Sequence, residues 1–153
     1  MFYCCYRLKT LNVTWSTVNW GNTSTRAITM SSMFYGCTAL ESLDLSSWDV
    51  SGWNCTTLAS TWASCNHLKK LKVNTWDTSN WHVTALNSTW DNCFLLNNVD
   101  LSSWDTTNWT ITSLGYTFRS NWKRRNFDDI KYWVTTNWRP TTMVSMFEQC
   151  YSV

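Results

Sequence analysis

Three aspartates stand at the same position of successive repeats and could together do metal chemistry. Asp49, Asp77 and Asp105 each follow a tryptophan and are spaced by 28 residues. A row of carboxylates could hold Ca²⁺, which prefers oxygen ligands. Asp at a turn can instead accept hydrogen bonds from the backbone just after it. The row ends at Val134, and we therefore favour turn capping and predict no metal site.

Cysteines also recur at one repeat position, and Asn121 takes this position in the remaining repeat. The members of the row are Cys5, Cys37, Cys65, Cys93 and Cys150. We interpret them as small buried thiols, because a disulfide framework seldom replaces one member by Asn. Cys4 and Cys55 lie outside the row and are the better candidates for a disulfide or a reactive thiol. No CxxC or Cys/His zinc spacing occurs, so we expect no metal and no cofactor.

Positive charge is concentrated at one place, where Lys123, Arg124 and Arg125 follow Arg119. One interpretation is a solvated bulge around an irregular repeat, and the other is a contact for an acidic partner or a glycan. The net charge of +2 makes nucleic acid a poor partner. No catalytic constellation of nucleophile, acid and base stands out, and we predict that the protein is not an enzyme.

Composition favours an extracellular or cell-surface protein over a cytosolic enzyme. The chain has thirteen Trp, one Pro and few charged residues, and it is rich in Thr, Ser and Asn. No apolar run approaches the roughly 20 residues of a membrane-spanning helix, so no membrane insertion is expected.

A repeat of about 28 residues organises all of these positions. We divide the chain into units 1–32, 33–60, 61–88, 89–116 and 117–145 and a partial unit 146–153. Both ends cut the period in mid-unit, which predicts a single repeat solenoid over 1–153 that is a segment of a longer array. Unit 117–145 is the outlier, because it gains a residue and carries Asn121 and Arg124 at apolar positions.

Each unit predicts one strand, one corner and one helix. Leu40, Leu43 and Leu45 end in the period-two alternation of a short strand. The following sequence Trp-Asp-Thr-Ser-Asn-Trp predicts a turn. Residues 57–64 have apolar side chains at i and i+4 after a Thr that can cap, which predicts a helix of about two turns. The fold class expected is therefore α/β: a leucine-rich-repeat-like solenoid of about five coils with one short parallel strand and one short helix each.

Stacked units would bring aromatic residues into three rows. Trp48, Trp76, Trp104 and Trp133 form the first, and Phe34, Trp62, Trp90, Phe118 and Phe147 form another. The second row contains Trp20, Trp53, Trp81, Trp109 and Trp138. Such a row could be a carbohydrate platform, but we favour the core, because Leu and Val that must face inward alternate with it. The second row follows a turn and has the best chance of partial exposure.

The segment Met33-Phe34-Tyr35-Gly36-Cys37-Thr38-Ala39-Leu40-Glu41-Ser42-Leu43-Asp44-Leu45-Ser46-Ser47-Trp48-Asp49 resembles the BspA-like leucine-rich repeats of bacterial surface proteins. The same repeat type occurs in mycoplasma surface lipoproteins. The similarity covers essentially the whole chain, although Trp53, Trp81 and Trp109 stand where that family usually has Val. The resemblance implies cell-surface attachment without catalysis and carries no active-site motif.

The leading hypothesis is thus a non-catalytic adhesion module that contacts an extracellular matrix or cell-surface protein or a glycan. Its contact residues would be Asn12, Asp44, Lys72 and Asp100 on the strand face, with Arg119, Lys123, Arg124 and Arg125 from the basic cluster. The alternative is a structural subunit of a fibre or particle coat, which would assemble head-to-tail through uncapped ends.

Overall fold

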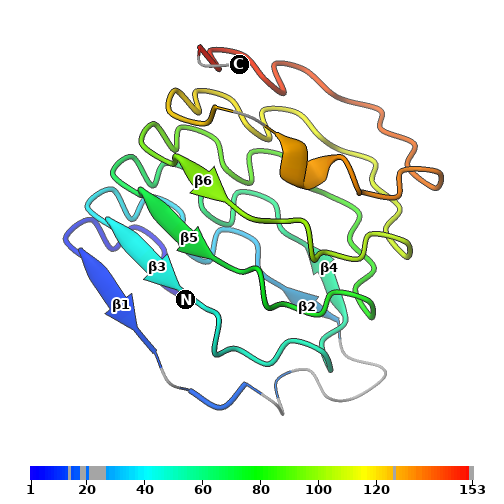
Figure 1. Ribbon diagram of the computed structural model, residues 1–153, viewed down its shortest axis with the longest axis horizontal. Helices are drawn as coiled ribbons and strands as arrows, with labels where there is room; N and C mark the ends of the chain where they lie inside the picture. The colour runs from blue at the N-terminus through cyan, green and yellow to red at the C-terminus, as the bar shows by residue number, and fades with distance from the viewer. Residues whose placement is uncertain (14, 18–19, 21–26, 126, 152–153) are drawn as a thin grey trace.

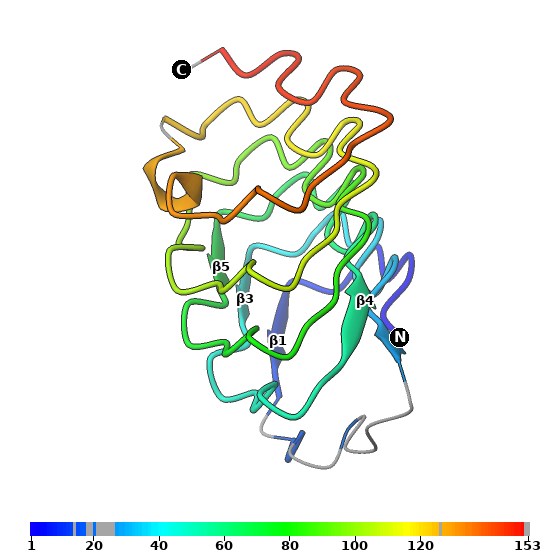
Figure 2. The same ribbon diagram turned by 90° about the vertical axis from the view of Figure 1, so that its right-hand side faces the viewer.

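The repeats stack as successive layers along one direction. The computed structural model describes residues 1–13, 15–17, 20, 27–125 and 127–151, with the side chains of Asn12 and Asn98 excepted. Each unit contributes one layer, made of a turn segment, a strand position, a tryptophan corner and a second strand position. The first and last layers lie at opposite ends of the stack (Figures 1 and 2).

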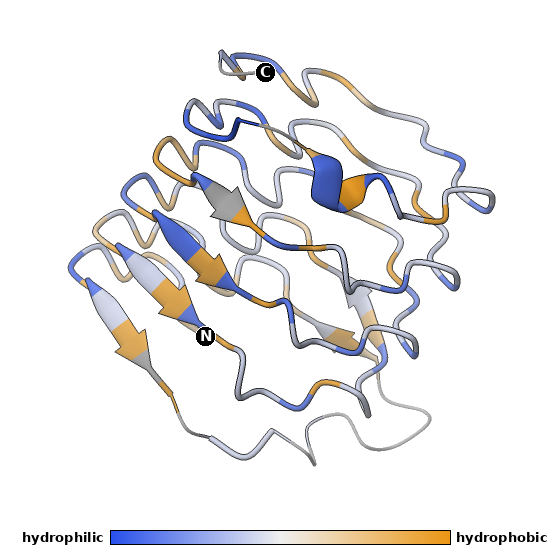
Figure 3. Ribbon diagram, viewed as in Figure 1, coloured by the Kyte–Doolittle hydropathy of each residue, from blue (hydrophilic) through white to orange (hydrophobic). Residues whose placement is uncertain are grey.

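The first strand position forms a four-stranded parallel sheet. Its order is β1 (Thr10–Asn12), β3 (Ser42–Asp44), β5 (Lys70–Lys72) and β6 (Asn98–Val99), as Figure 1 shows. Residues 28 apart pair directly, for example Leu43 with Leu71. Leu43 and Leu71 are buried, whereas their neighbours along the strands are polar and face outward, and this alternation is visible in Figure 3.

The second strand position gives a smaller parallel sheet. It consists of β2 (Ile28–Thr29) and β4 (Cys55–Thr57). Single parallel bridges from Thr57 to Ala85, from Ala85 to Ser113 and from Ser113 to Thr142 continue the same line through the later layers. The stack is therefore tied together along two sides.

The predicted helix over 57–64 is wrong, because this segment consists of two successive four-residue turns. Ser60 and Ser64 have φ values of 56° and 60°, in the left-handed region that a right-handed helix does not contain. Trp62 N–H donates to Thr89 O of the next layer at 3.0 Å, whereas Ala63 N–H donates back to Ser60 O. Alternate N–H groups thus bind the next layer instead of forming an α-helix.

The expected α/β leucine-rich-repeat-like solenoid is therefore corrected. The described residues contain no α-helix, and their only helical element is the 3-10 turn η1 (Asp128–Ile130). Their short strands form two small parallel sheets with no solenoid closure. What remains of the prediction is the stacking of repeats and the strand that each of units one to four carries.

The aromatic rows lie in the core, as predicted, except for Trp20, Trp138 and Phe147 at the ends of the stack, which are partly exposed. Trp76 and Trp104 stack with centroids 6.0 Å apart and planes within 5°. Trp53, Trp81 and Trp109 are at most 1% exposed, so the partial exposure expected for this row is wrong for its central members. Stacked indoles bury large apolar areas and so contribute to the hydrophobic stabilisation of the stack.

Side-chain donors tie the layers together inside the core. Thr89 Oγ1 donates to Leu58 O of the preceding layer at 3.1 Å and to Leu86 O of its own turn at 2.7 Å. Cys93 Sγ donates to Trp62 O at 3.1 Å. Asn121 keeps this contact in its layer, where Nδ2 donates to Trp90 O at 2.7 Å, which explains why Asn can replace Cys there. All seven cysteines are free thiols.

Candidate binding surface

The outward side of the four-stranded sheet, here the strand face, carries polar residues in register. Asp44 of β3 pairs with Lys72 of β5, with Nζ and Oδ2 2.7 Å apart. This hydrogen bond and those from Ser46 lower the pKa of Asp44 from 3.8 to about 2. Asn12 pairs with Asp44 through the backbone, but its side chain lies outside the described residues.

Lys72 also lines a shallow hollow on this face. The hollow has a volume of about 350 Å³ and is bounded by Lys70, Lys72, Asn74 and Asp100 over the buried Leu71. Asp100 Oδ1 accepts hydrogen bonds from Ser102, which lower its pKa and fix its carboxylate. Among the described residues, Lys70 has no ion-pair partner. The hollow therefore offers an available ammonium group beside a fixed carboxylate.

A second ion pair extends the strand face and was not anticipated. Glu41 and Lys69, in the layers of β3 and β5, are 3.0 Å apart, and this contact lowers the pKa of Glu41. The signal was available, because opposite charges 28 residues apart meet whenever a 28-residue repeat stacks in register. Lys70 and Asn74 were likewise missed.

The basic cluster does not form one exposed patch. Arg119 makes a bidentate contact with Asp91 of the preceding layer, with distances of 2.8 and 2.7 Å. Its guanidinium also lies 4.4 Å from the ring centroid of Tyr116. The pKa of Arg119 is raised mainly by the hydrogen bonds to Asp91. Arg119 is thus bound within the chain, although it stays partly exposed.

Arg124 is buried, with only 2% of its surface exposed. It pairs with Asp129 and stacks over Phe127 at 4.4 Å, and desolvation lowers its pKa. Only its neighbours Lys123 and Arg125 face solvent. The cluster predicted from four consecutive or nearby charges therefore presents two freely exposed cations.

An exposed aromatic pair lies beside these cations. Phe94 and Trp122 stack with centroids 4.2 Å apart, and Trp122 is 40% exposed. Sequence reasoning missed it because it considered only the three core rows.

The three aspartates of the corner cap turns, as predicted. Asp49 Oδ1 accepts hydrogen bonds from Ser51 N and Oγ, and Asp77 and Asp105 accept from the backbone N–H two residues on. Within the described part of the chain, no group of three or more His, Cys, Asp or Glu is placed to hold a metal ion.

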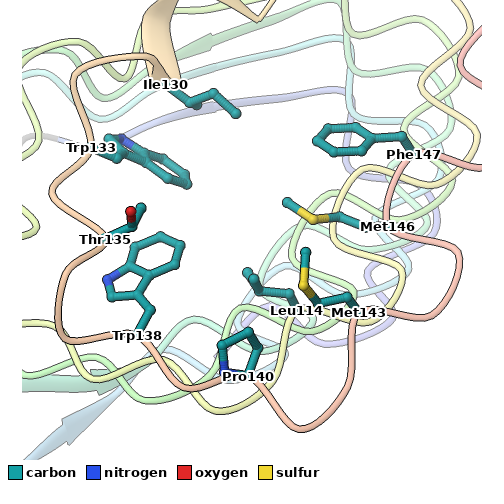
Figure 4. Close-up of a pocket in the computed structure, with 9 residues that line it drawn as sticks. All are labelled: Leu114, Ile130, Trp133, Thr135, Trp138, Pro140, Met143, Met146 and Phe147. Carbon is teal, nitrogen blue, oxygen red and sulfur yellow. The ribbon is translucent and has the colours of Figure 1, made fainter.

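A second, apolar hollow lies at the C-terminal end of the stack (Figure 4). Its volume is about 380 Å³, and Trp133 and Trp138 face Met143, Met146 and Phe147 across it. Met143 and Phe147 are 54% and 45% exposed. This surface differs from the strand face in having almost no charge.

Comparison with known proteins places the chain in a family. The family model described as "Mycoplasma protein of unknown function, DUF285" matches residues 1–56 and 56–153. The chain belongs to this family. The two matches of the DUF285 chain meet at Thr56, inside β4, and together they span every layer. No curated protein and no solved structure matches it.

Over the ranges that the structure describes, the DUF285 chain has no helix that is long and apolar enough to cross a membrane.

Proposed function

We propose that this chain is a non-catalytic binding module at the cell surface, which contacts an extracellular protein or a glycan through the strand face. The observation that carries the proposal is the hollow of Lys70, Lys72, Asn74 and Asp100. Its polar residues stand on a sheet whose inward positions are all apolar, so the outward chemistry can change without loss of the core.

The sequence supports the same proposal from a second direction. The repeats resemble BspA-like repeats, whose role is attachment to matrix proteins or to other cells. The match to the DUF285 family is compatible with that resemblance. The polar surface composition favours an extracellular location.

The partner would carry an anionic group and a hydrogen-bond donor, or hydroxyl groups that can act as both acceptor and donor. An anionic group would meet Lys70, and a donor would meet the carboxylate of Asp100, which is already oriented by Ser102.

The test is binding of the 153-residue chain to immobilised matrix proteins and to a glycan array. Lys70→Glu removes the available ammonium group, and it should weaken binding at least about tenfold. Arg139→Glu is the matched control, because Arg139 is exposed but lies on the line of the second sheet. The exchange Asp44→Lys with Lys72→Asp keeps an ion pair while inverting its charges. If neither change alters binding to any ligand that the unmodified chain captures, the strand-face proposal fails.

A further inference from the structure

One layer of the strand face departs from the hydrogen bonding of the layers beside it. In the layer of β6, Ser102 Oγ donates to Asp100 Oδ1 at 2.6 Å, and the layer of β3 has the same Asp–Ser pair at the same distance. Unit 61–88, which lies between them, has Lys72 and Asn74 at these two positions. Within the described part of the chain the Asn74 side chain makes no hydrogen bond, so its amide can bind a ligand.

The charged groups around the hollow differ in how far the chain already uses them. Lys72 pairs with Asp44 at 2.7 Å, whereas Lys70 forms no ion pair with any described residue. Asp100 is fixed through Oδ1, but over the described ranges its Oδ2 accepts no hydrogen bond. The hollow therefore offers an ammonium group that donates, a carboxylate oxygen that accepts, and an amide that does both.

These groups define the chemistry of a complementary ligand. Lys70 can only donate, so it requires an anion, and the ionised Asp100 can only accept, so it requires a donor. A hydroxyl is a better donor here than an ammonium, because Lys72 lines the same hollow and its positive charge opposes a second cation. A neighbouring hydroxyl can bind the amide of Asn74. The ligand therefore carries one anionic group and adjacent hydroxyl groups.

The size of the hollow suits one small rigid unit. Its volume of about 350 Å³ is near the lower end of small-ligand sites, which span about 300–1,000 Å³. A sugar ring holds an acidic group and several hydroxyls in fixed positions, so few rotatable bonds are frozen when it binds. A protein partner would have to supply the same groups from separate side chains, each of which loses rotamer freedom.

We propose that the hollow binds one acidic sugar residue of a glycan. The acidic group meets Lys70, adjacent hydroxyls meet the amide of Asn74 and Oδ2 of Asp100, and the ring lies over Leu71. This proposal rests on the strand-face proposal and names its ligand. Uronic acids, sialic acids and sugar sulfates share the required chemistry, and the experiment distinguishes them.

NMR titration of single sugars into the 153-residue chain tests the proposal. The acidic probes are the methyl glycosides of glucuronic acid and of N-acetylneuraminic acid and the 6-sulfate of methyl glucoside, and methyl glucoside itself is the neutral counterpart. At least one acidic probe should bind about tenfold or more tightly than methyl glucoside, and the tightest identifies the source of the charge. Free alanine is a zwitterion and should bind no better than methyl glucoside.

Two variants separate the contacts. Lys70→Gln should abolish the preference for acidic probes, whereas Asn74→Ala should weaken their binding about threefold and leave the preference in place. Lys131→Gln is the matched control, because Lys131 is an exposed lysine that does not line the hollow, and it should change neither quantity. Circular dichroism melts verify that each variant is folded.

Equal binding of acidic and neutral sugars, a preference that survives Lys70→Gln, or binding of alanine as tight as that of the acidic probes overturns the acidic-sugar proposal. Absence of binding of every acidic probe at about 10 mM also overturns it. The strand-face proposal survives these results if Lys70→Glu still weakens the capture of a matrix protein, which would make the partner a protein. It fails separately, if the strand-face variants alter the capture of no ligand.

Discussion

Replacement of Thr89 by Val tests whether buried hydroxyl groups hold the layers together. Thr89 is fully buried, and its Oγ1 donates to carbonyls of two turns, at 3.1 and 2.7 Å. Val has the same shape but no donor. Loss of the hydrogen bonds costs about 1 kcal/mol, because both carbonyls keep a backbone donor. A methyl group placed 2.7 Å from Leu86 O must also shift, which costs about 1 kcal/mol more.

We therefore expect Thr89→Val to lower the free energy of unfolding by about 2 kcal/mol. Urea unfolding followed by tryptophan fluorescence would show this as a midpoint lowered by about 1 M, for a slope of about 2 kcal/mol/M. The comparison requires that the unmodified chain and Thr89→Val show the same dependence of unfolding free energy on urea concentration. A changed slope would indicate that layers unfold separately, and a single free energy of unfolding would then not be defined.

Thr112→Val is the matched control. Thr112 Oγ1 also donates to the preceding layer, at 3.2 Å to Thr84 O, but the residue is exposed and water can replace it. Its cost should stay within about 0.5 kcal/mol. The reasoning is refuted if Thr89→Val leaves the midpoint unchanged, or if Thr112→Val costs as much.

Three further outcomes follow from single contacts. Because the pKa of Asp44 falls from 3.8 to about 2 on folding, its pairing with Lys72 stabilises the chain above pH 3.8, and the contribution is lost as the pH falls toward 2. Both side chains are half exposed, so Lys72→Met should cost less than about 1 kcal/mol at pH 5, and the cost should shrink as the pH falls to 2 in urea unfolding. Gly36 has a φ of 69°. We expect Gly36→Asn to be tolerated, because Asn92 adopts a similar backbone conformation at the equivalent position, whereas Gly36→Val should lower the free energy of unfolding by about 2 kcal/mol in the same assay. Burial raises the pKa of Cys93, so iodoacetamide at pH 8.5 should label this thiol only after unfolding in urea, as mass spectrometry of the peptides would reveal.

The repeat period was enough to predict which residues meet. A shift of 28 places Leu43 on Leu71 and Trp76 on Trp104, and both contacts are present. These contacts follow from stacking in register alone, since equal spacing brings equal positions together whatever the path of the backbone within a unit.

The path within a unit was not predictable in the same way. Leu58 and Trp62 have the i, i+4 spacing of a helix, but consecutive four-residue turns give the same spacing. The difference lies in Ser60 and Ser64, whose left-handed backbone lets alternate N–H groups reach the next layer. Ser has no strong preference for that conformation, so only the neighbouring layer, which accepts these hydrogen bonds, selects it.

For the candidate surface, the outward direction of the charged side chains on the strands was predicted, whereas the burial of a charged side chain in unit 117–145 was not. Asp44 and Lys72 alternate with buried Leu, which directs them outward. Arg124 stands at the position of Leu68 and Leu96, which are fully buried, and it is buried as they are. The repeat position decided its environment, and the charge of the residue did not.

Unit 117–145 continues the stack on the side of the turn and the second sheet, but not on the side of the first sheet. Its turn continues the ladder, because Asn121 supplies the donor that Cys93 supplies one layer earlier, and Thr142 continues the line of the second sheet. Among the described residues the first sheet ends at β6, and the 3-10 turn η1 follows in this unit. Arg124, paired with Asp129 and packed on aromatic rings, closes this side with a charge that an incoming apolar strand would have to displace. The apolar hollow lies over the turn and the tryptophan corner of this unit, and Arg124 does not line it.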